Sequence, residues 1–341
     1  MIESQSPPAS VEPPPSRSPS EPPRPIDLIY IVGTHRSGGT TLGTILSRGA
    51  SVFYAGEIYR FPYPIFDPGD PNRGCSCGKM VAECPFWTAI QADAGSHPRL
   101  LTDLREGQKR YDAWHRIPIT EWRYLRQDPS LGQYARRMRE FVRVLADRSG
   151  SSVVVESSFS PLRGMLYRRA PAEEGRIRFI HLVRDGRSFF GSETGPIPQG
   201  VEAGTPLQRT PPAVIARWML FHLAAILLCS RGPDTYLRVR FEDVLQRPRE
   251  TLGTIQEFLG IDLTDAIELI ETHRPFPMVH LCAGNRARLA GSLVVRPQMA
   301  TPPPLSRTHT VLFWAMAGWL ALLFGYRPGA DRAPVPPRRP G

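Results

Sequence analysis

Residues 31–49, IVGTHRSGGTTLGTILSRG, carry the glycines and hydroxyls that a phosphate-binding loop needs. Apolar residues precede Gly33, and residues 38–41 lead into a helical pattern, so a strand would deliver an anion to the first amides of a helix. A nucleoside triphosphatase carries its lysine at the position of Gly39, where it bridges the β- and γ-phosphates. Here the cation lies three residues earlier, at Arg36. We therefore expect an anionic ligand other than a hydrolysed ATP or GTP.

A second candidate phosphate site is the segment FIHLVRDGRSFFGS, residues 179–192. An apolar run that predicts a strand ends at Arg184, and Ser192 follows eight residues later on a predicted helix. A guanidinium offers a fork of donors and a serine offers a hydroxyl, which together suit a dianionic phosphate. Taken alone, the segment is equally compatible with a structural ion pair at a strand end.

Together these two segments resemble the sulfotransferases that use 3′-phosphoadenosine 5′-phosphosulfate (PAPS). GTHRSGGTTL is similar to the 5′-phosphosulfate loop of that family, and LVRDGR with its later serine is similar to the 3′-phosphate motif. The resemblance implies that Arg36 is the cation on the sulfonate side and that Arg184 and Ser192 hold the 3′-phosphate. It also implies a cradle around the 5′-phosphosulfate made of Ser37, Gly38, Gly39, Thr40 and Thr41.

Three weaker matches extend the resemblance, and one of them departs from the family pattern. HLCAGNRAR, residues 280–288, implies that Asn285 and Arg288 approach the nucleotide, whereas residues 240–260 resemble a scaffold segment of the family. VVVESSFSP, residues 153–161, resembles an Asp-Ser-Ser-Lys-x-Pro motif, but Glu156 replaces the Asp and Phe159 replaces the Lys. The lost cation leaves more charge stabilisation to Arg36 or to an arginine from elsewhere.

Sulfuryl transfer needs a base to accept the proton of the attacking hydroxyl. We choose Glu57, which follows the second predicted strand on the side where strand ends form a ligand crevice, at a Gly-Glu step that several branches of the family share. The alternative is a carboxylate that orders an arginine or caps the next helix. His35 is the main rival, because an imidazole titrates near neutral pH. His181 lies within a predicted strand and is expected in the core. The reaction requires no metal, and we predict no metal ligands in the site.

The elements that must position these residues alternate between strands and helices. Short apolar runs predict strands within 27–33, 51–57, 151–158, 176–185 and 235–243. Helical spacing separates these runs, for example over residues 131–148. This order predicts an α/β fold, a P-loop-type parallel sheet with helices on both faces and a helical or irregular insertion on the acceptor side.

The chain is expected to form one sulfotransferase domain, residues 26–326, between two tails. Residues 1–25 and 327–341 are rich in proline and poor in large apolar residues, so we expect both to be disordered. Residues 58–130 form the insertion, which we interpret as a lid or acceptor-binding region. Its many aromatic residues would stack on a sugar, enclose an apolar acceptor or form the core of the insertion itself.

The net charge of +10 comes almost entirely from arginine, since Lys79 and Lys109 are the two lysines. The arginines are scattered and no nucleic-acid module is present, so we expect a small-molecule, lipid or glycan acceptor and no nucleic-acid partner. No apolar leader follows the N-terminus, and we expect a cytoplasmic, bacterial protein. The apolar segment 311–326 is short for a bilayer span, so a buried helix is favoured over membrane association. Residues 213–229 are expected to form a core helix.

Three of the five cysteines, Cys75, Cys77 and Cys84, lie close together in the chain. They could hold zinc, form a disulfide or stay reduced in a tight turn. The spacing is not that of a Cys-x-x-Cys knuckle, and no fourth ligand follows nearby, so no metal site is predicted.

Two functions from other classes stay open beside the transferase. One is a non-catalytic nucleotide-binding or membrane-associated module that has lost the chemistry, an alternative that rests on Phe159 in place of the lysine. The other is an atypical P-loop kinase, which would bind ATP with magnesium.

Overall fold

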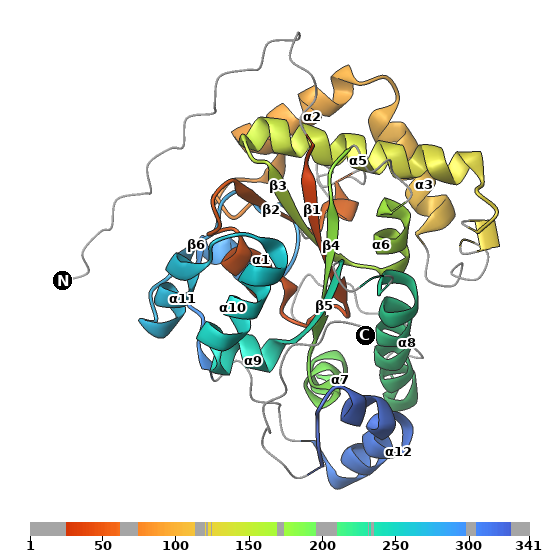
Figure 1. Ribbon diagram of the computed structural model, residues 1–341, viewed down its shortest axis with the longest axis vertical. Coiled ribbons are helices and arrows are strands. Elements are labelled where there is room, and N and C mark those ends of the chain that lie inside the picture. Colours follow the sequence, from red (N-terminus) through yellow and green to blue (C-terminus); the bar gives the residue numbers. More distant parts are fainter. Residues whose placement is uncertain are drawn as a thin grey trace.

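The computed structural model describes residues 25–61, 74–112, 120, 122–123, 125–168, 174–195, 210–230, 232, 235–297 and 305–328. A five-stranded sheet lies at the centre of the molecule (Figure 1). Its strands follow the order β2 (Val52–Gly56), β3 (Val153–Phe159), β1 (Asp27–Gly33), β4 (Ile177–Val183) and β5 (Tyr236–Arg240). All neighbouring strands are parallel, so their carboxyl ends meet at one edge of the sheet.

Both faces of the sheet are buried. Along β1, Leu28, Tyr30 and Val32 belong to one buried apolar cluster, whereas Ile29 and Ile31 belong to another. Successive side chains of a strand point to opposite faces, so a strand buried on both faces is apolar at nearly every position. This explains why the sequence shows continuous apolar runs rather than alternation.

Helices cover each face, and Figure 1 shows them on the two sides of the sheet. One cluster is built with α2 (Pro85–Ser96), α3 (Leu100–Tyr111), α5 (Pro129–Ser149), α6 (Pro161–Tyr167) and α8 (Pro211–Cys229). The other is built with α1 (Gly39–Leu46), α9 (Phe241–Gln246), α10 (Pro248–Leu259), α11 (Thr264–Glu271), β6 (Phe276–Pro277) and β7 (Ser292–Leu293). The predicted α/β fold class is confirmed.

A third apolar cluster joins α8 to α7 (Gly186–Thr194) and α12 (Arg307–Leu323). Segment 311–326 therefore lies mostly in α12, and one side of this helix packs inside the protein. Val311 and Trp319 on the same helix remain exposed. In the described part of the chain, α8 is the helix long and apolar enough to cross a membrane by length and composition. Core helices of soluble proteins meet the same criterion, and α8 buries Trp218, His222 and Ala225.

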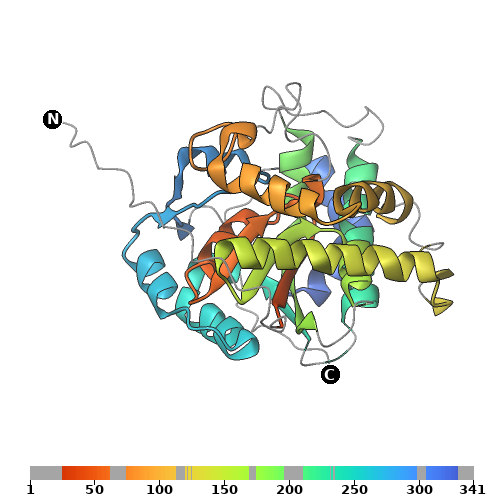
Figure 2. The same cartoon turned by 90° about the horizontal axis from the view of Figure 1, so that it is seen from above.

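The described part of the insertion is a packed subdomain. It contains η1 (Ile58–Arg60), η2 (Val81–Glu83), α2 and α3, and α2 and α3 lie beside α5 (Figure 2). The ring of Phe61 lies 5.4 Å from that of Trp87 and 4.9 Å from that of Phe141, so these aromatics form core. Residues 62–73 and 113–119 of the predicted lid, and most of both predicted tails, lie outside the described residues.

Candidate phosphate-binding site

The loop between β1 and α1 brings a helix start to the carboxyl edge of the sheet. Gly38 is the N-cap of α1 and has a φ of 93°, a left-handed conformation that favours glycine. A Cβ on Gly38 would lie 2.7 Å from Cζ of Phe241 and closer still to two other ring atoms. In the described structure no side chain caps α1, so its first amides keep the arrangement from which helix starts bind anions.

Gly39, at the position of the nucleotide-hydrolase lysine, lies against the ring of Phe159. A Cβ on Gly39 would lie 2.7 Å from Cε1 of that ring and closer still to Cζ. Phe159 ends β3 with a φ of 62°, which is rare for a bulky residue, and its side chain is only 3% exposed. The two positions that carry lysine elsewhere are therefore joined here by one apolar contact. No cation enters the site from either position.

The hydroxyls of the predicted cradle stabilise the loop itself. Ser37 is buried, and its Oγ lies 2.6 Å from Oγ1 of Thr34. Oγ1 of Thr40 accepts a hydrogen bond of 3.2 Å from the backbone N–H of Asn285, and Thr41 is buried within α1. The side chains of Ser37 and Thr40 thus hold the loop in shape, and its binding of a phosphosulfate stays a prediction.

The two predicted phosphate clamps are in direct contact. Nη1 of Arg184 donates a hydrogen bond of 2.7 Å to the backbone carbonyl of Arg36, which has a φ of 63°. The Arg184 guanidinium lies 5.4 Å from the ring centroid of Phe241, the same ring that covers Gly38. Ser192 lies on α7 and donates to the carbonyl of Phe189.

The segment predicted as scaffold, residues 240–260, supports the second clamp. The carboxylate of Glu242 accepts hydrogen bonds of 2.9 Å from the backbone N–H of Asp185 and of 2.8 Å from the hydroxyl of Tyr326. Asp185 in turn caps α7 by accepting from the N–H of Arg187. These buried contacts hold the backbone directly after β4 and thereby position Arg184, the residue that follows this strand.

A carboxylate and a second arginine, neither of which the sequence analysis selected, lie beside Arg36. Nε of Arg36 lies 2.9 Å from Oε1 of Glu193, and Arg217 on α8 forms an ion pair with the other oxygen. Two guanidinium groups around one carboxylate leave an excess of positive charge, which suits an anion. Arg217 interrupts the apolar run AVIARWMLFHLAA, and that interruption is the one signal of its role in the sequence.

Glu57 follows β2 directly and points toward the loop of residues 280–288. Its Oε1 lies 3.9 Å from the Cβ position of Gly284, and its side chain is 12% exposed. Its Oε2 lies 3.5 Å from Nε of Arg60, and Glu57 is also the N-cap of η1. The contact with Arg60 fits the structural alternative of a carboxylate that orders an arginine, whereas the Glu57 side chain makes no capping hydrogen bond to η1. Glu57 also hydrogen bonds with the side chain of Tyr59.

His35 is close to both groups of charges, Glu57 with Arg60 and Glu193 with Arg217. Its ring centroid is 5.5 Å from that of Phe159, and the residue keeps solvent-exposed surface. Burial lowers the pKa of His35 below 6.5, and the negative charge of Glu57 opposes that shift. The imidazole is therefore neutral at pH 7. His181, in contrast, is fully buried, with Nε2 lying 2.7 Å from Nδ1 of His222, which confirms the expected core position.

The loop of residues 280–288 contacts helix α1, and the implied approach of Asn285 and Arg288 to a nucleotide stays a prediction. The backbone of Asn285 contacts Thr40, and the Asn285 side chain accepts from the N–H of Ala287 at the start of η6 (Arg286–Ala290). Arg288 is 1% exposed, and its Nη1 donates to the carbonyl of Gly284 at 2.8 Å. The described contacts of the Arg288 side chain thus stabilise the loop.

Glu156, which replaces the family aspartate, is fully buried. It accepts a hydrogen bond of 2.7 Å from Nε of Arg163, and Ser158 and Tyr167 also donate to it. Nη1 of Arg163 lies 3.0 Å from Asp112. Arg163 is therefore bound to buried carboxylates and does not replace the missing lysine.

No protein-family profile and no curated protein matches this sequence. Among solved structures, the chain is similar to the sulfotransferase domain of the Synechococcus PCC 7002 olefin synthase, with 19% identity, a TM-score of 0.42, and coverage of 92% of this chain and 99% of that chain. It is similar to the sulfotransferase domain of the curacin biosynthetic pathway, with 14% identity, a TM-score of 0.44, and coverage of 87% and 98%. Sulfotransferase STF9 from Mycobacterium avium has 14% identity, a TM-score of 0.45, and coverage of 90% and 78%.

Proposed function

We propose that this protein is a sulfotransferase that moves a sulfuryl group from PAPS to a hydroxyl of a carbohydrate, lipid or small molecule. The observation that carries the proposal is the hydrogen bond from Arg184 to the carbonyl of Arg36, which joins the two predicted clamps at the carboxyl edge of the sheet. A donor with phosphate groups at two positions needs two such clamps. The contact between Gly39 and Phe159 supports the same assignment. The ring leaves no room at residue 39 for the lysine on which ATP and GTP hydrolysis depends.

The side chains present fit the charge changes of the reaction. The acceptor oxygen would attack sulfur while the bond from sulfur to the 5′-phosphate oxygen breaks, and adenosine 3′,5′-bisphosphate would leave with the extra negative charge. We assign the stabilisation of that charge to Arg36, Arg217 and the first amides of α1. A preorganised donor of this kind lowers a barrier by about 3 kcal/mol. The proton of the acceptor would pass to a base.

We assign that base to Glu57 and keep His35 as the competing candidate. Glu57→Gln preserves size, removes the negative charge that pairs with Arg60 and cannot accept the proton, so kcat should fall by about 10²–10⁴-fold with donor affinity retained. His35→Asn should lower kcat less and leave the pH profile of kcat in place. If instead His35→Asn removes the acid limb of the profile and Glu57→Gln does not, the imidazole is the base.

Binding of adenosine 3′,5′-bisphosphate against adenosine 5′-monophosphate tests the donor assignment, because only the former has the 3′-phosphate that Arg184 is proposed to hold. The wild-type protein should prefer the bisphosphate without magnesium, and Arg184→Met should reduce that preference by about 10–100-fold, the factor for a charge-assisted hydrogen bond. Arg176→Met is the matched control, since Arg176 pairs with Asp27 where β4 begins, at the opposite edge of the sheet.

Two outcomes would support the alternative functions instead. Tight magnesium-dependent binding of ATP, with no preference for the bisphosphate, would favour an atypical kinase. Bisphosphate binding with the predicted preference, but no transfer from radiolabelled donor to any of a broad panel of acceptors, would favour a non-catalytic nucleotide-binding module.

A further inference from the structure

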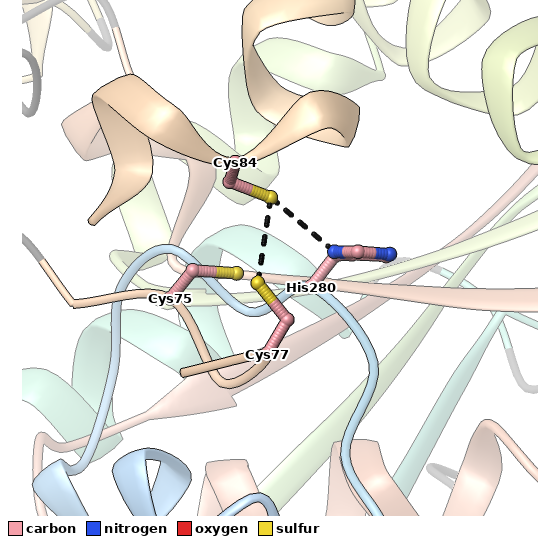
Figure 3. A group of neighbouring side chains, drawn as sticks. All are labelled: Cys75, Cys77, Cys84 and His280. Carbon is pink, nitrogen blue, oxygen red and sulfur yellow. Dashed lines mark hydrogen bonds between the residues drawn. The ribbon is translucent and has the colours of Figure 1, made fainter. Parts of the chain in front are cut away.

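The three clustered cysteines meet a fourth group that the sequence analysis did not connect with them. The Sγ atoms of Cys75, Cys77 and Cys84 and a ring nitrogen of His280 all lie within 4.8 Å of one another (Figure 3). His280 comes 196 residues after Cys84. The prediction of no metal site rested on the lack of a nearby fourth ligand, and the fold supplies one from a distant loop.

Two of the distances between these atoms are close to those of a tetrahedral zinc site. Zinc binds sulfur at about 2.3 Å and nitrogen at about 2.0 Å, so ligand atoms at the corners of a tetrahedron are separated by about 3.5–3.8 Å. Sγ of Cys77 lies 3.7 Å from Sγ of Cys84, and Sγ of Cys84 lies 3.3 Å from Nδ1 of His280. A disulfide would join only two of the four groups and leave the others facing it.

The backbone and the neighbouring rings hold the four groups in place. The N–H of Cys75 donates to the carbonyl of Lys79 at 2.8 Å, and the N–H of Gly78 donates to the carbonyl of Cys75 at 3.0 Å. This turn presents Cys75 and Cys77 side by side. On the opposite side, Nε1 of Trp87 donates to the carbonyl of His280.

Stacking and an unusual backbone conformation both constrain the ring of His280. Phe86 stacks on that ring with the planes 9° apart. His280 also has a φ of 53°, a conformation that non-glycine residues adopt rarely and that the surrounding contacts must maintain.

We propose that Cys75, Cys77, Cys84 and His280 bind one structural zinc ion. Four protein ligands fill a tetrahedron and leave no open position, which distinguishes a structural site from a catalytic one. The proposal is independent of the proposed function, and its test does not depend on turnover.

The ion would attach the insertion to the loop that contacts the phosphate-binding helix. Ser76, between two of the ligands, donates its N–H to the carbonyl of Leu281 at 3.1 Å and accepts from the N–H of Leu281 at 2.8 Å. Four residues further along, Asn285 contacts Thr40. The zinc would thus fix the start of this loop without touching the nucleotide.

Metal analysis of the full-length protein, purified under reducing conditions, tests the proposal. We expect about one zinc per chain, which is lost in Cys84→Ser and in His280→Asn and is retained in Cys229→Ser. Cys229 is a matched control because it is a buried thiol outside the cluster. Zinc at the same stoichiometry in the Cys84 and His280 variants would overturn the assignment.

Cobalt substitution keeps the test decisive even where a variant folds poorly. The reduced, metal-free wild-type protein should take up Co²⁺ with the visible bands of tetrahedral coordination and the near-ultraviolet charge-transfer bands of thiolate ligands. Cys77→Ser, at the exposed position of the cluster, should weaken the charge-transfer bands. An octahedral cobalt spectrum in the wild-type protein, or a disulfide between two of these cysteines in protein purified without reductant, would overturn the proposal.

Discussion

The contact between Gly39 and Phe159 makes a quantitative prediction about the lysine-free loop. Gly39 is the first residue of α1 and lacks a left-handed φ, so its backbone accepts an L-residue. A Cβ there would nevertheless overlap the Phe159 ring, which is buried and held at a positive φ. Gly39→Ala should therefore destabilise the fold by about 1–3 kcal/mol, the usual cost of overpacking.

The same substitution should become harmless once the ring is removed. Phe159→Ala alone should cost about 3–5 kcal/mol for the lost side chain and the cavity. In that background Gly39→Ala should stabilise by up to about 1 kcal/mol, because alanine favours a helix over glycine. The double-mutant cycle should thus give a coupling of about 2 kcal/mol. Gly253→Ala in α10 is the matched control, since a Cβ at Gly253 meets nothing within 4 Å, and it should be neutral or stabilising.

Urea denaturation followed by circular dichroism measures the cycle, and binding of adenosine 3′,5′-bisphosphate by the folded variants measures its effect on the loop. We expect Gly39→Ala to weaken binding, because the ring and the helix start must separate. A destabilisation below about 0.5 kcal/mol, or a coupling near zero, would refute the reasoning and show that the ring moves aside toward His35.

Two further predictions concern the charges around the clamps. Glu193→Gln should tighten bisphosphate binding by up to about fivefold, because the carboxylate that pairs with Arg36 competes with the incoming anion; weaker binding would show instead that it holds the arginine in position. Burial, and then the charge of Asp185, raises the pKa of Glu242. Protonated Glu242 therefore stabilises the folded protein. This stabilisation is fully present below the pKa of about 4.3 of an unfolded glutamate, and it is lost as pH rises through the higher pKa of Glu242 in the folded protein. In urea unfolding, Glu242→Gln should therefore gain stability relative to the wild type as pH rises from about 4.5 to about 7.5, and an unchanged difference would refute the sign.

The sheet and the long helices could be predicted because local patterns specify them. The apolar run of β1 lies between neighbours on both faces, so burial selects apolar residues at each position. Helix α5 carries its own boundaries, since Asp128 caps its first turn, Pro129 fits that turn and Gly150 ends it with a φ of 67°. Signals of this kind lie within a few residues of the element that they define.

The parts of the site that sequence reasoning missed depend on contacts between distant segments. Arg217 lies within residues 213–229, which were expected to form a core helix, and it reaches Glu193 only because α8 packs beside α7. His280 was assigned to a nucleotide-contacting motif, and nothing local connects it with Cys84, 196 residues earlier. Phe159 was interpreted as a loss, whereas the contact with Gly39 shows that it has a packing partner.

Gly39, in place of the nucleotide-hydrolase lysine, and Phe159, in place of the lysine of the family motif, depend on one another. Once an aromatic ring occupies the space beside the helix start, residue 39 has no room for a side chain, and the cations of the site must enter from other elements. They do so from the loop after β1 at Arg36, from the end of β4 at Arg184 and from α8 at Arg217. Because these guanidinium groups come from three separate elements, their positions depend on how the helices pack on the sheet. The affinity for a ligand that bridges them would therefore depend on the packing of the whole carboxyl edge. For this reason a substitution at a buried support such as Glu242 should alter binding although the residue does not contact the ligand.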